Sequence, residues 1–208
     1  PDNRLIEKTL NLLKKLKLNK NISVVKTKIN KLENWYISHP SGNLKHQSNR
    51  FFSIEALKYK NKLSSNIQPI INQKEVGILG IICQKQLGTL KFLLQAKFEP
   101  GNKNTYQLSP TIQATKSNIE RVHGGKSKKY YKYFIDKKSK VHFSILLSEQ
   151  GTKFYNKKNK NILIEVTENK DIPLDKEFIW LSLSEIKVLI SKNNIVNMST
   201  RSVLSCVN

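Results

Sequence analysis

Several classes of protein are disfavoured by what this sequence contains little of. The chain has 208 residues and no apolar run near the roughly 18 to 20 residues that span a bilayer, so we expect no membrane segment. Its first residues, PDNRLIEK, lack the positively charged segment and apolar stretch of a secretion signal. Cys83 and Cys206 lie in apolar surroundings without CxxC or Cys/His spacing, which favours reduced thiols over a disulfide or a metal site. We therefore expect a cytoplasmic protein.

Motifs for cofactors and metals are also missing. The glycines of VGILGII have GxxG spacing, and neither GxGxxG nor GxxxxGK[ST] occurs, so a bound dinucleotide or ATP has no support. The four histidines show no HExxH or comparable ligand spacing. We expect a reaction without a cofactor and without a metal.

The charge balance is strongly basic, because 37 Lys+Arg face 15 Asp+Glu, for a net charge of +22. Such a balance is typical of nucleic-acid or anionic-membrane binding. However, lysine is enriched together with Asn and Ile throughout the chain, a pattern that compositional bias produces without a functional need. The densest runs, 126–140 and 153–160, lack the interleaved glycines of a base-stacking surface. Nucleic-acid binding is the weaker interpretation, and polyanion binding stays an alternative.

Arginine is scarce against this lysine background. Only Arg4, Arg50, Arg121 and Arg201 occur, and the last three lie in the polar segments HQSNRFF, RVHGG and NMSTR. The planar guanidinium suits a diphosphate or carboxylate better than an ammonium does. These three residues are therefore candidate ligands of a diphosphate, with a structural salt bridge as the alternative.

The most informative stretch is residues 95–125, QAKFEPGNKNTYQLSPTIQATKSNIERVHGG. It concentrates amides, hydroxyls, an acid, a base and glycines between short apolar segments, whereas a loop that only needs solvation is simpler and more repetitive. Residues 148–151 and 197–201 have the same character, and each adjoins an apolar run. We predict a functional site spread over several loops of one scaffold.

Hydrophobic periodicity predicts an α+β fold with a mixed or antiparallel sheet flanked by helices. The expected helices are 3–18, 116–123, 129–136, 185–191 with Ser184 as its cap, and 200–207. The expected strands are 51–59, 76–84, 89–98, 141–147, 162–167 and 178–183, with a hairpin turn near 84–88 and a polar connection at 157–161.

Six ordered segments carry a resemblance to a known family. They are QPIINQKEVGILG (68–80), QAKFEPGN (95–102), SPTIQATKSN (109–118), RVHGG (121–125), SEQG (148–151) and NMSTR (197–201). In this order they resemble the NDP-hexose 2,3-dehydratases, over nearly the whole chain. The resemblance implies a Nudix-like domain over 35–208, after an N-terminal helix and lead-in at 1–34. The Arg and clustered Glu residues of the Nudix catalytic helix are missing, so diphosphate hydrolysis is not expected.

The resemblance also implies a reaction. The expected substrate is a nucleotide sugar, dTDP-4-keto-6-deoxy-D-glucose, which loses water to give a 3,4-diketo sugar for 2-deoxysugar biosynthesis. A 3-ketoreductase would act downstream. Family members usually carry two copies of this unit, whereas this sequence has one, so we expect a homodimer. A unit that binds the nucleotide sugar without catalysis is the alternative.

Such a reaction needs a base, an acid and donors for an enolate oxygen. Glu149 and His123 are the first candidates for acid and base, and Lys97 and Glu99 would lie on one side of a strand. A simple ion pair is the alternative for each carboxylate. The candidate substrate-binding residues are Arg50, Gln68, Gln73, Gln95, Asn102, Gln113, Thr115, Asn118, Arg121, Gly124, Gln150, Arg201 and Trp35, the last as a stacking platform for the base.

Overall fold

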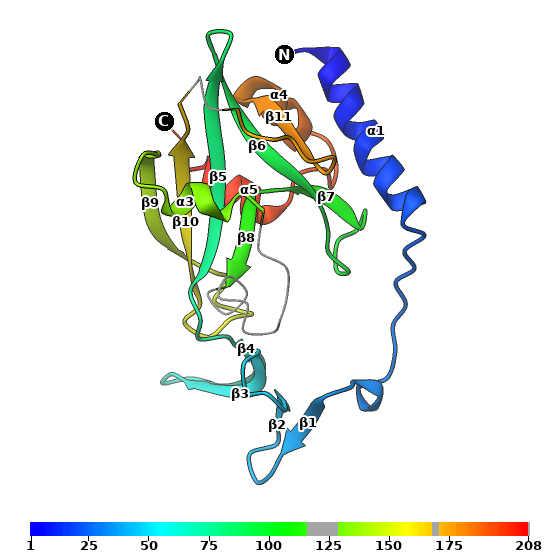
Figure 1. The fold of residues 1–208 in the computed structure, drawn as a ribbon. Helices are drawn as coiled ribbons and strands as arrows, with labels where there is room; N and C mark the ends of the chain where they lie inside the picture. The colour runs from blue at the N-terminus through cyan, green and yellow to red at the C-terminus, as the bar shows by residue number, and fades with distance from the viewer. Residues whose placement is uncertain (116–128, 168–170, 208) are drawn as a thin grey trace. The chain divides into compact units, whose positions relative to one another are not determined.

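The computed structural model describes residues 1–115, 129–167 and 171–207 (Figure 1). The chain divides into two compact units. Unit 1 comprises Pro1–Val24, Ile78–Ile145 and Lys160–Asn208, and unit 2 comprises Val25–Gly77 and Leu146–Asn159. The boundary expected between 1–34 and 35–208 stays a prediction. In the described residues, no helix is long and apolar enough to cross a bilayer.

One sheet has seven strands, in the order β11-β6-β5-β10-β9, with β7 paired to β6 and β8 to β5. The strands are β5 (Gly77–Gln86), β6 (Thr89–Phe98), β7 (Tyr106–Ser109), β8 (Ile112–Thr115), β9 (Lys140–Ser148), β10 (Lys158–Glu165) and β11 (Phe178–Ser182). β6 runs antiparallel to β5, β7 and β11. Together with the helices below, these pairings confirm the predicted α+β class and the β5–β6 hairpin.

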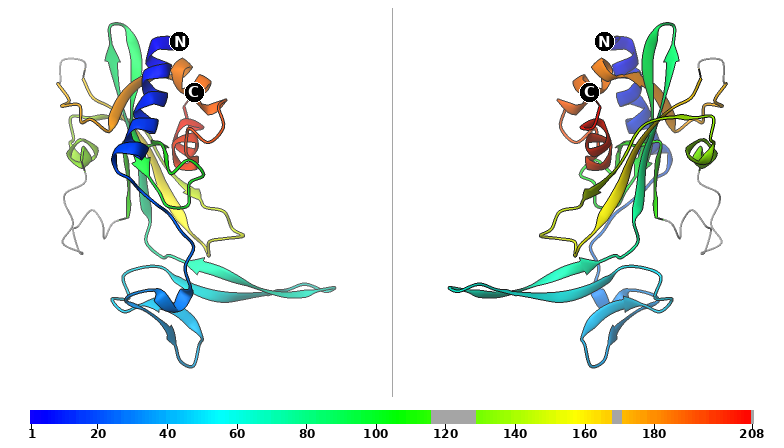
Figure 2. Two further views of the ribbon diagram at one scale, coloured as in Figure 1. Left: turned by 90° about the vertical axis from the view of Figure 1, so that its right-hand side faces the viewer. Right: turned by 90° about the vertical axis from the view of Figure 1, so that its left-hand side faces the viewer.

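Helices cover both faces of this sheet. α1 (Asn3–Asn19), α4 (Leu183–Ile190) and α5 (Met198–Leu204) lie on one face, and α3 (Tyr131–Ile135) lies on the other (Figure 2). Side chains alternate along β6, so Leu94 packs in a cluster with residues of α1, α4 and α5, whereas Leu93 packs with Tyr133 of α3. β6 is therefore buried on both faces along its apolar part.

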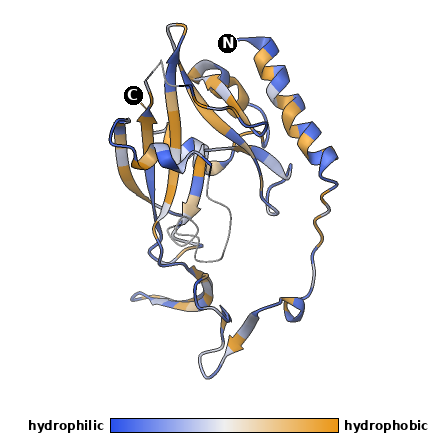
Figure 3. Ribbon diagram, viewed as in Figure 1, coloured by the Kyte–Doolittle hydropathy of each residue, from blue (hydrophilic) through white to orange (hydrophobic). Residues whose placement is uncertain are grey.

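α1 is the amphipathic helix that the sequence predicted. Ile6, Leu13 and Leu16 are buried on one side, and lysines occupy much of the other (Figure 3). The carboxylate of Asp2 accepts hydrogen bonds from the backbone N–H groups of Arg4 and Leu5 and so caps the first turn. Packing of the apolar stripe holds α1 against the sheet.

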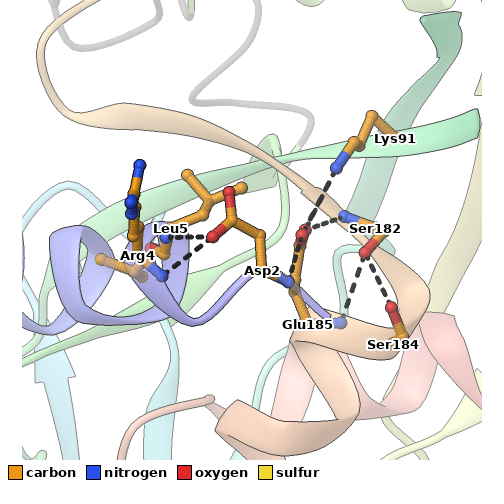
Figure 4. Close-up of polar contacts among 8 residues, drawn as sticks. Asp2, Arg4, Leu5, Lys91, Ser182, Ser184 and Glu185 are labelled. Carbon is orange, nitrogen blue, oxygen red and sulfur yellow. Dashed lines mark hydrogen bonds and ion pairs between the residues drawn. The ribbon is translucent and has the colours of Figure 1, made fainter. Parts of the chain in front are cut away.

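α4 begins with a capping box centred on Ser182. The predicted cap, Ser184, is wrong, because β11 ends at Ser182, whose hydroxyl accepts from the backbone N–H of Glu185. The Glu185 carboxylate accepts from Ser182 N at 2.7 Å, from Asp2 N at 3.3 Å and from Lys91 Nζ at 3.3 Å (Figure 4). Burial acts to raise the pKa of Glu185, but these donors outweigh it and the pKa lies below its ordinary value.

Unit 2 contains a four-stranded antiparallel sheet in sequential order. Its strands are β1 (Trp35–Ser38), β2 (Asn43–His46), β3 (Ser53–Lys60) and β4 (Ser65–Asn72), preceded by the short 3-10 helix η1 (Ile29–Lys31). β3 was predicted, but β1, β2 and β4 were not. β1 and β2 have only four residues each, too few for an alternating pattern to stand out, and Pro69 interrupts the pattern of β4.

Three other features differ from the sequence prediction. The expected polar connection at 157–161 is wrong: β10 starts at Lys158, and its Asn159 and Asn161 are buried. β7 and β8 were not predicted, so part of the site expected in loops lies on strands. α5 starts at Met198, because Asn197 caps it by accepting from Thr200 N. The helix expected at 116–123 lies outside the described residues.

Candidate functional site

Four predicted site residues meet at the end of β6 in unit 1. Lys97 Nζ donates to Glu99 Oε1 at 2.9 Å, so the two side chains lie on one side, as predicted. Gln113 Nε2, on β8, donates to the same oxygen at 3.1 Å, and Asn102 Nδ2 donates to Glu99 Oε2 at 3.3 Å. We call these four residues the Glu99 cluster.

The Glu99 cluster combines a held carboxylate with an ammonium that solvent can reach. Glu99 accepts three side-chain donors, which fixes its orientation, while Lys97 keeps 28% of its side chain exposed. Gln113 Oε1 is buried and has no hydrogen-bond partner among the described residues. An oriented carboxylate beside an exposed ammonium can bind polar groups of a ligand.

The neighbouring predicted residues divide into two groups. Gln95 and Thr115 are half-buried on β6 and β8. The remaining members of the motif lie outside the described residues: Asn118, Arg121, His123 and Gly124. Their proposed roles therefore stay predictions from the sequence.

A second polar group surrounds Glu149 in unit 2. Asn159 Nδ2 donates to Glu149 Oε1, and the amide oxygen of Asn159 accepts from Gly77 N at 3.1 Å. Lys157 is 6% exposed and donates to the carbonyl oxygen of Glu75. Burial lowers the pKa of Lys157, against the opposing attraction of Glu149 and Glu75. No sequence pattern distinguished Lys157 or Asn159, since both lie in a lysine- and asparagine-rich run.

Unit 2 also holds a pocket of about 440 Å³. It contains two predicted ligands, Arg50 and Gln73. The other lining residues are Lys45, His46, Asn49, Phe51, Phe52, Ser53, Glu55, Asn72, Lys74 and Glu75. Trp35 is half-buried, and its ring centroid lies 5.0 Å from that of Phe52. Trp35 is thus part of the aromatic group behind the pocket and does not line it.

The last three predicted ligands make contacts with residues of their own unit. Gln68 Nε2 donates to the carbonyl of Thr152 at 3.1 Å. Gln150 is exposed, and its carbonyl accepts from the backbone N–H groups of Lys153 and Phe154. Arg201 is exposed on α5, where its Nε donates to the carbonyl of Asn197 at 3.4 Å. These three residues thus lie outside the Glu99 cluster and do not line the unit 2 pocket.

Curated relatives resemble most of this chain. A dTDP-4-dehydro-6-deoxy-alpha-D-glucopyranose 2,3-dehydratase of Saccharopolyspora spinosa is 44% identical over 181 residues, 85% of this chain and 37% of the relative. Proteins of the same name from Amycolatopsis orientalis and Streptomyces violaceoruber are 43% and 42% identical, over 85% and 88% of this chain and 39% and 42% of their own. The chain therefore spans about two fifths of the length of these relatives.

Comparison with solved structures is less informative. The crystal structure of the C. elegans Ap4A hydrolase aligns with a TM-score of 0.39 and 14% identity, over 64% of this chain and 95% of that one. The Nudix-like arrangement therefore stays a prediction. The sequence profile of the NDP-hexose 2,3-dehydratases matches residues 6–207. With the three relatives above, this match shows that the chain belongs to the NDP-hexose 2,3-dehydratase family.

Proposed function

We propose that this protein is a dehydratase that removes water from dTDP-4-keto-6-deoxy-D-glucose across C2 and C3. The observation that carries the proposal is the identity of 42–44% to three dehydratases of that printed name, over 85–88% of this chain. The Glu99 cluster supports it, because it offers an oriented carboxylate, an ammonium and amide groups in one place.

The chemistry needs proton transfers and the cleavage of one C–O bond. The C4 ketone acidifies the C3 proton, and the C2 hydroxyl is β to that ketone. A base takes the C3 proton, the enolate expels the C2 hydroxyl, and an acid protonates it so that it leaves as water. The resulting enol then tautomerises to the 3,4-diketone. No electron leaves the substrate, so the step needs no oxidant.

Each unit, taken by itself, offers a candidate group for these roles. The Lys97 ammonium can donate a proton or a hydrogen bond to a developing oxyanion, and Glu99 holds it in place. Glu149 is half-buried and oriented by Asn159, which suits a carboxylate that removes a proton. His123, outside the described residues, keeps its predicted role as acid or base.

Turnover tests this proposal directly. The protein is incubated with dTDP-4-keto-6-deoxy-D-glucose and a 3-ketoreductase that traps the unstable diketone, and mass spectrometry measures the loss of water. We expect turnover by the wild type and by Glu33→Gln, an exposed control, and its loss in Lys97→Met and Glu149→Gln. Absence of water loss in the wild type would contradict the function. Wild-type turnover by both variants would instead contradict the residue assignments.

We propose further that the chain forms a homodimer through β9. β9 is the last strand of the sheet order, and among the described residues no strand pairs with its outer edge. Val141 and Ile145, on one face of β9, are 54% and 42% exposed. An exposed apolar edge strand of nine residues, with no proline, is a template for pairing with another strand.

A second copy fits this edge without bringing like charges together. In an antiparallel pair centred on Ser144, Val141 would lie opposite Leu147 of the other copy, and Lys140 opposite Ser148. Light scattering should give twice the chain mass of 24.0 kDa. Ser144→Lys, which would place two ammonium groups face to face, should give the monomer, whereas Ser64→Lys in an exposed turn should not. A monomeric wild type would overturn the dimer.

A further inference from the structure

The pocket of unit 2 combines aromatic and charged groups that the reaction itself does not require. Its volume of about 440 Å³ lies in the range of sites for small organic ligands, roughly 300 to 1,000 Å³. Every lining residue belongs to unit 2, in two segments of the chain, 45–55 and 72–75. The pocket is thus formed by the turn from β2 to β3 and by the end of β4.

We propose that this pocket binds the nucleoside diphosphate end of the substrate, with the base stacked on the Phe51 ring and the diphosphate held by Arg50 and the neighbouring lysines. The identity of the ligand rests on the proposed function. The placement of the nucleotide rests on the pocket itself, and it can be tested without any turnover.

The aromatic part of the pocket is the Phe51 ring, which packs against a neighbouring aromatic side chain. Phe51 is 48% exposed, although a phenylalanine is an apolar residue that folding tends to bury. Its ring centroid lies 4.4 Å from that of His46, whose ring in turn lies 5.4 Å from that of Trp35. Each of these contacts is edge-to-face, so the rings support one another at their edges. A ring held in this way can stack on a nucleobase.

The cationic part lies beside the Phe51 ring. Arg50 directly precedes Phe51 in the sequence, and Lys45 and Lys74 line the same pocket. A guanidinium can bind two phosphate oxygens at once, and ammonium groups add charge without directional demand. A diphosphate next to the base would therefore meet three basic side chains, Lys45, Arg50 and Lys74.

Of the two carboxylates that line the pocket, Glu55 favours a nucleotide over a simple polyphosphate. Glu55 Oε1 accepts from Ser53 Oγ at 2.5 Å and from Asn72 Nδ2 at 2.9 Å. The Ser53 hydroxyl is the main cause that lowers the pKa of Glu55, so the group is ionised at neutral pH. An ionised carboxylate repels a phosphate but accepts from a ribose hydroxyl or a base N–H. Glu55 therefore gives the pocket a hydrogen-bond acceptor for which inorganic phosphate offers no matching donor.

Calorimetry with three probes tests the proposal: dTDP, thymidine and inorganic pyrophosphate. We expect dTDP to bind the wild type, with an affinity that falls as salt rises, and to bind more tightly than either of its parts. Phe51→Leu should weaken dTDP binding about tenfold through lost stacking, yet leave pyrophosphate binding unchanged. Arg50→Lys should lower the affinity for both dTDP and pyrophosphate, because it keeps the charge but loses the paired hydrogen bonds of the guanidinium.

Matched controls lie on β3 outside the pocket. Tyr59→Leu removes an exposed aromatic ring, and Lys60→Ala removes an exposed cation. Both should bind dTDP as the wild type does. Circular dichroism of each variant identifies any that fails to fold. Phe51→Tyr keeps an aromatic ring, so this variant should bind dTDP as the wild type does, and it tests the stacking if Phe51→Leu does not fold.

Several outcomes would overturn the inference. If dTDP fails to bind the wild type at millimolar concentration, or binds the Phe51 and Arg50 variants as well as the wild type, the nucleotide does not occupy this pocket. Equal affinity for pyrophosphate and dTDP would show a general anion site. Binding of dTDP that depends on Phe51 and Arg50, without any turnover, would leave this inference standing and contradict the proposed dehydratase function.

Discussion

Gly80 on β5 is the position where one added methyl group should have the clearest effect. A Cβ at Gly80 would lie 2.4 Å from Phe134 Cε1, 2.7 Å from Phe134 Cζ and 2.7 Å from Ile112 Cγ2. Ordinary contacts of this kind begin at 3.4 Å, so the Phe134 ring of α3 must move by about 1 Å. Gly80 therefore allows α3 to pack closely on the sheet.

The expected cost of Gly80→Ala follows from overpacking. Forcing an extra carbon into a packed core typically costs about 1–3 kcal/mol. Because the Phe134 ring is only partly buried, part of the strain can relax, and we expect about 1–2 kcal/mol. For a chain of this length, that cost lowers the melting temperature by about 2–4 °C per kcal/mol.

A double-mutant cycle measured by thermal and urea unfolding tests the reasoning. Phe134→Leu removes the ring atoms nearest to the new Cβ, so Gly80→Ala should cost less in that background, by about 1 kcal/mol. Gly101→Ala, where a Cβ meets nothing within 4 Å, is the control and should be nearly neutral. If the effects of Gly80→Ala and Phe134→Leu simply add, the clash does not cause the loss of stability and the argument fails.

Two further predictions concern titratable groups. Glu185→Gln should lower the free energy of unfolding at pH 7 by about 1–3 kcal/mol, because Asp2 N, Ser182 N and Lys91 Nζ would lose their charged acceptor. The pKa of Glu185 is lowered in the folded state, so this stability is present above its ordinary pKa of 4.5 and is lost as pH falls through the folded pKa; a difference that persists at pH 2 in urea unfolding would contradict it. Burial raises the pKa of Cys83 to about 12, so iodoacetamide at pH 8 should modify the partly exposed Cys206 first, and equal labelling of both by peptide mass spectrometry would refute this.

Patterns within short stretches of sequence predicted much of unit 1. The apolar spacing of residues 3–18 predicted α1, and two apolar runs joined by a turn-like segment in 76–98 predicted the β5–β6 hairpin, since both signals are local in the sequence. The alternation of side chains along a strand placed Lys97 and Glu99 on one side. Ordered motifs along the chain were enough to indicate the family.

The tertiary structure alone decided which distant residues meet. Gln113 reaches Glu99 because β8 joins the same sheet as β6, and no local pattern indicates that contact. Likewise, Asn159 orients Glu149 only because β10 starts earlier than its polar sequence suggested. The unit 2 pocket needs two segments, 45–55 and 72–75, which meet because β3 pairs with β4 and places Ser53 opposite Asn72. Periodicity fixes which side of an element a residue lies on, whereas contacts between elements depend on how the strands pair and pack.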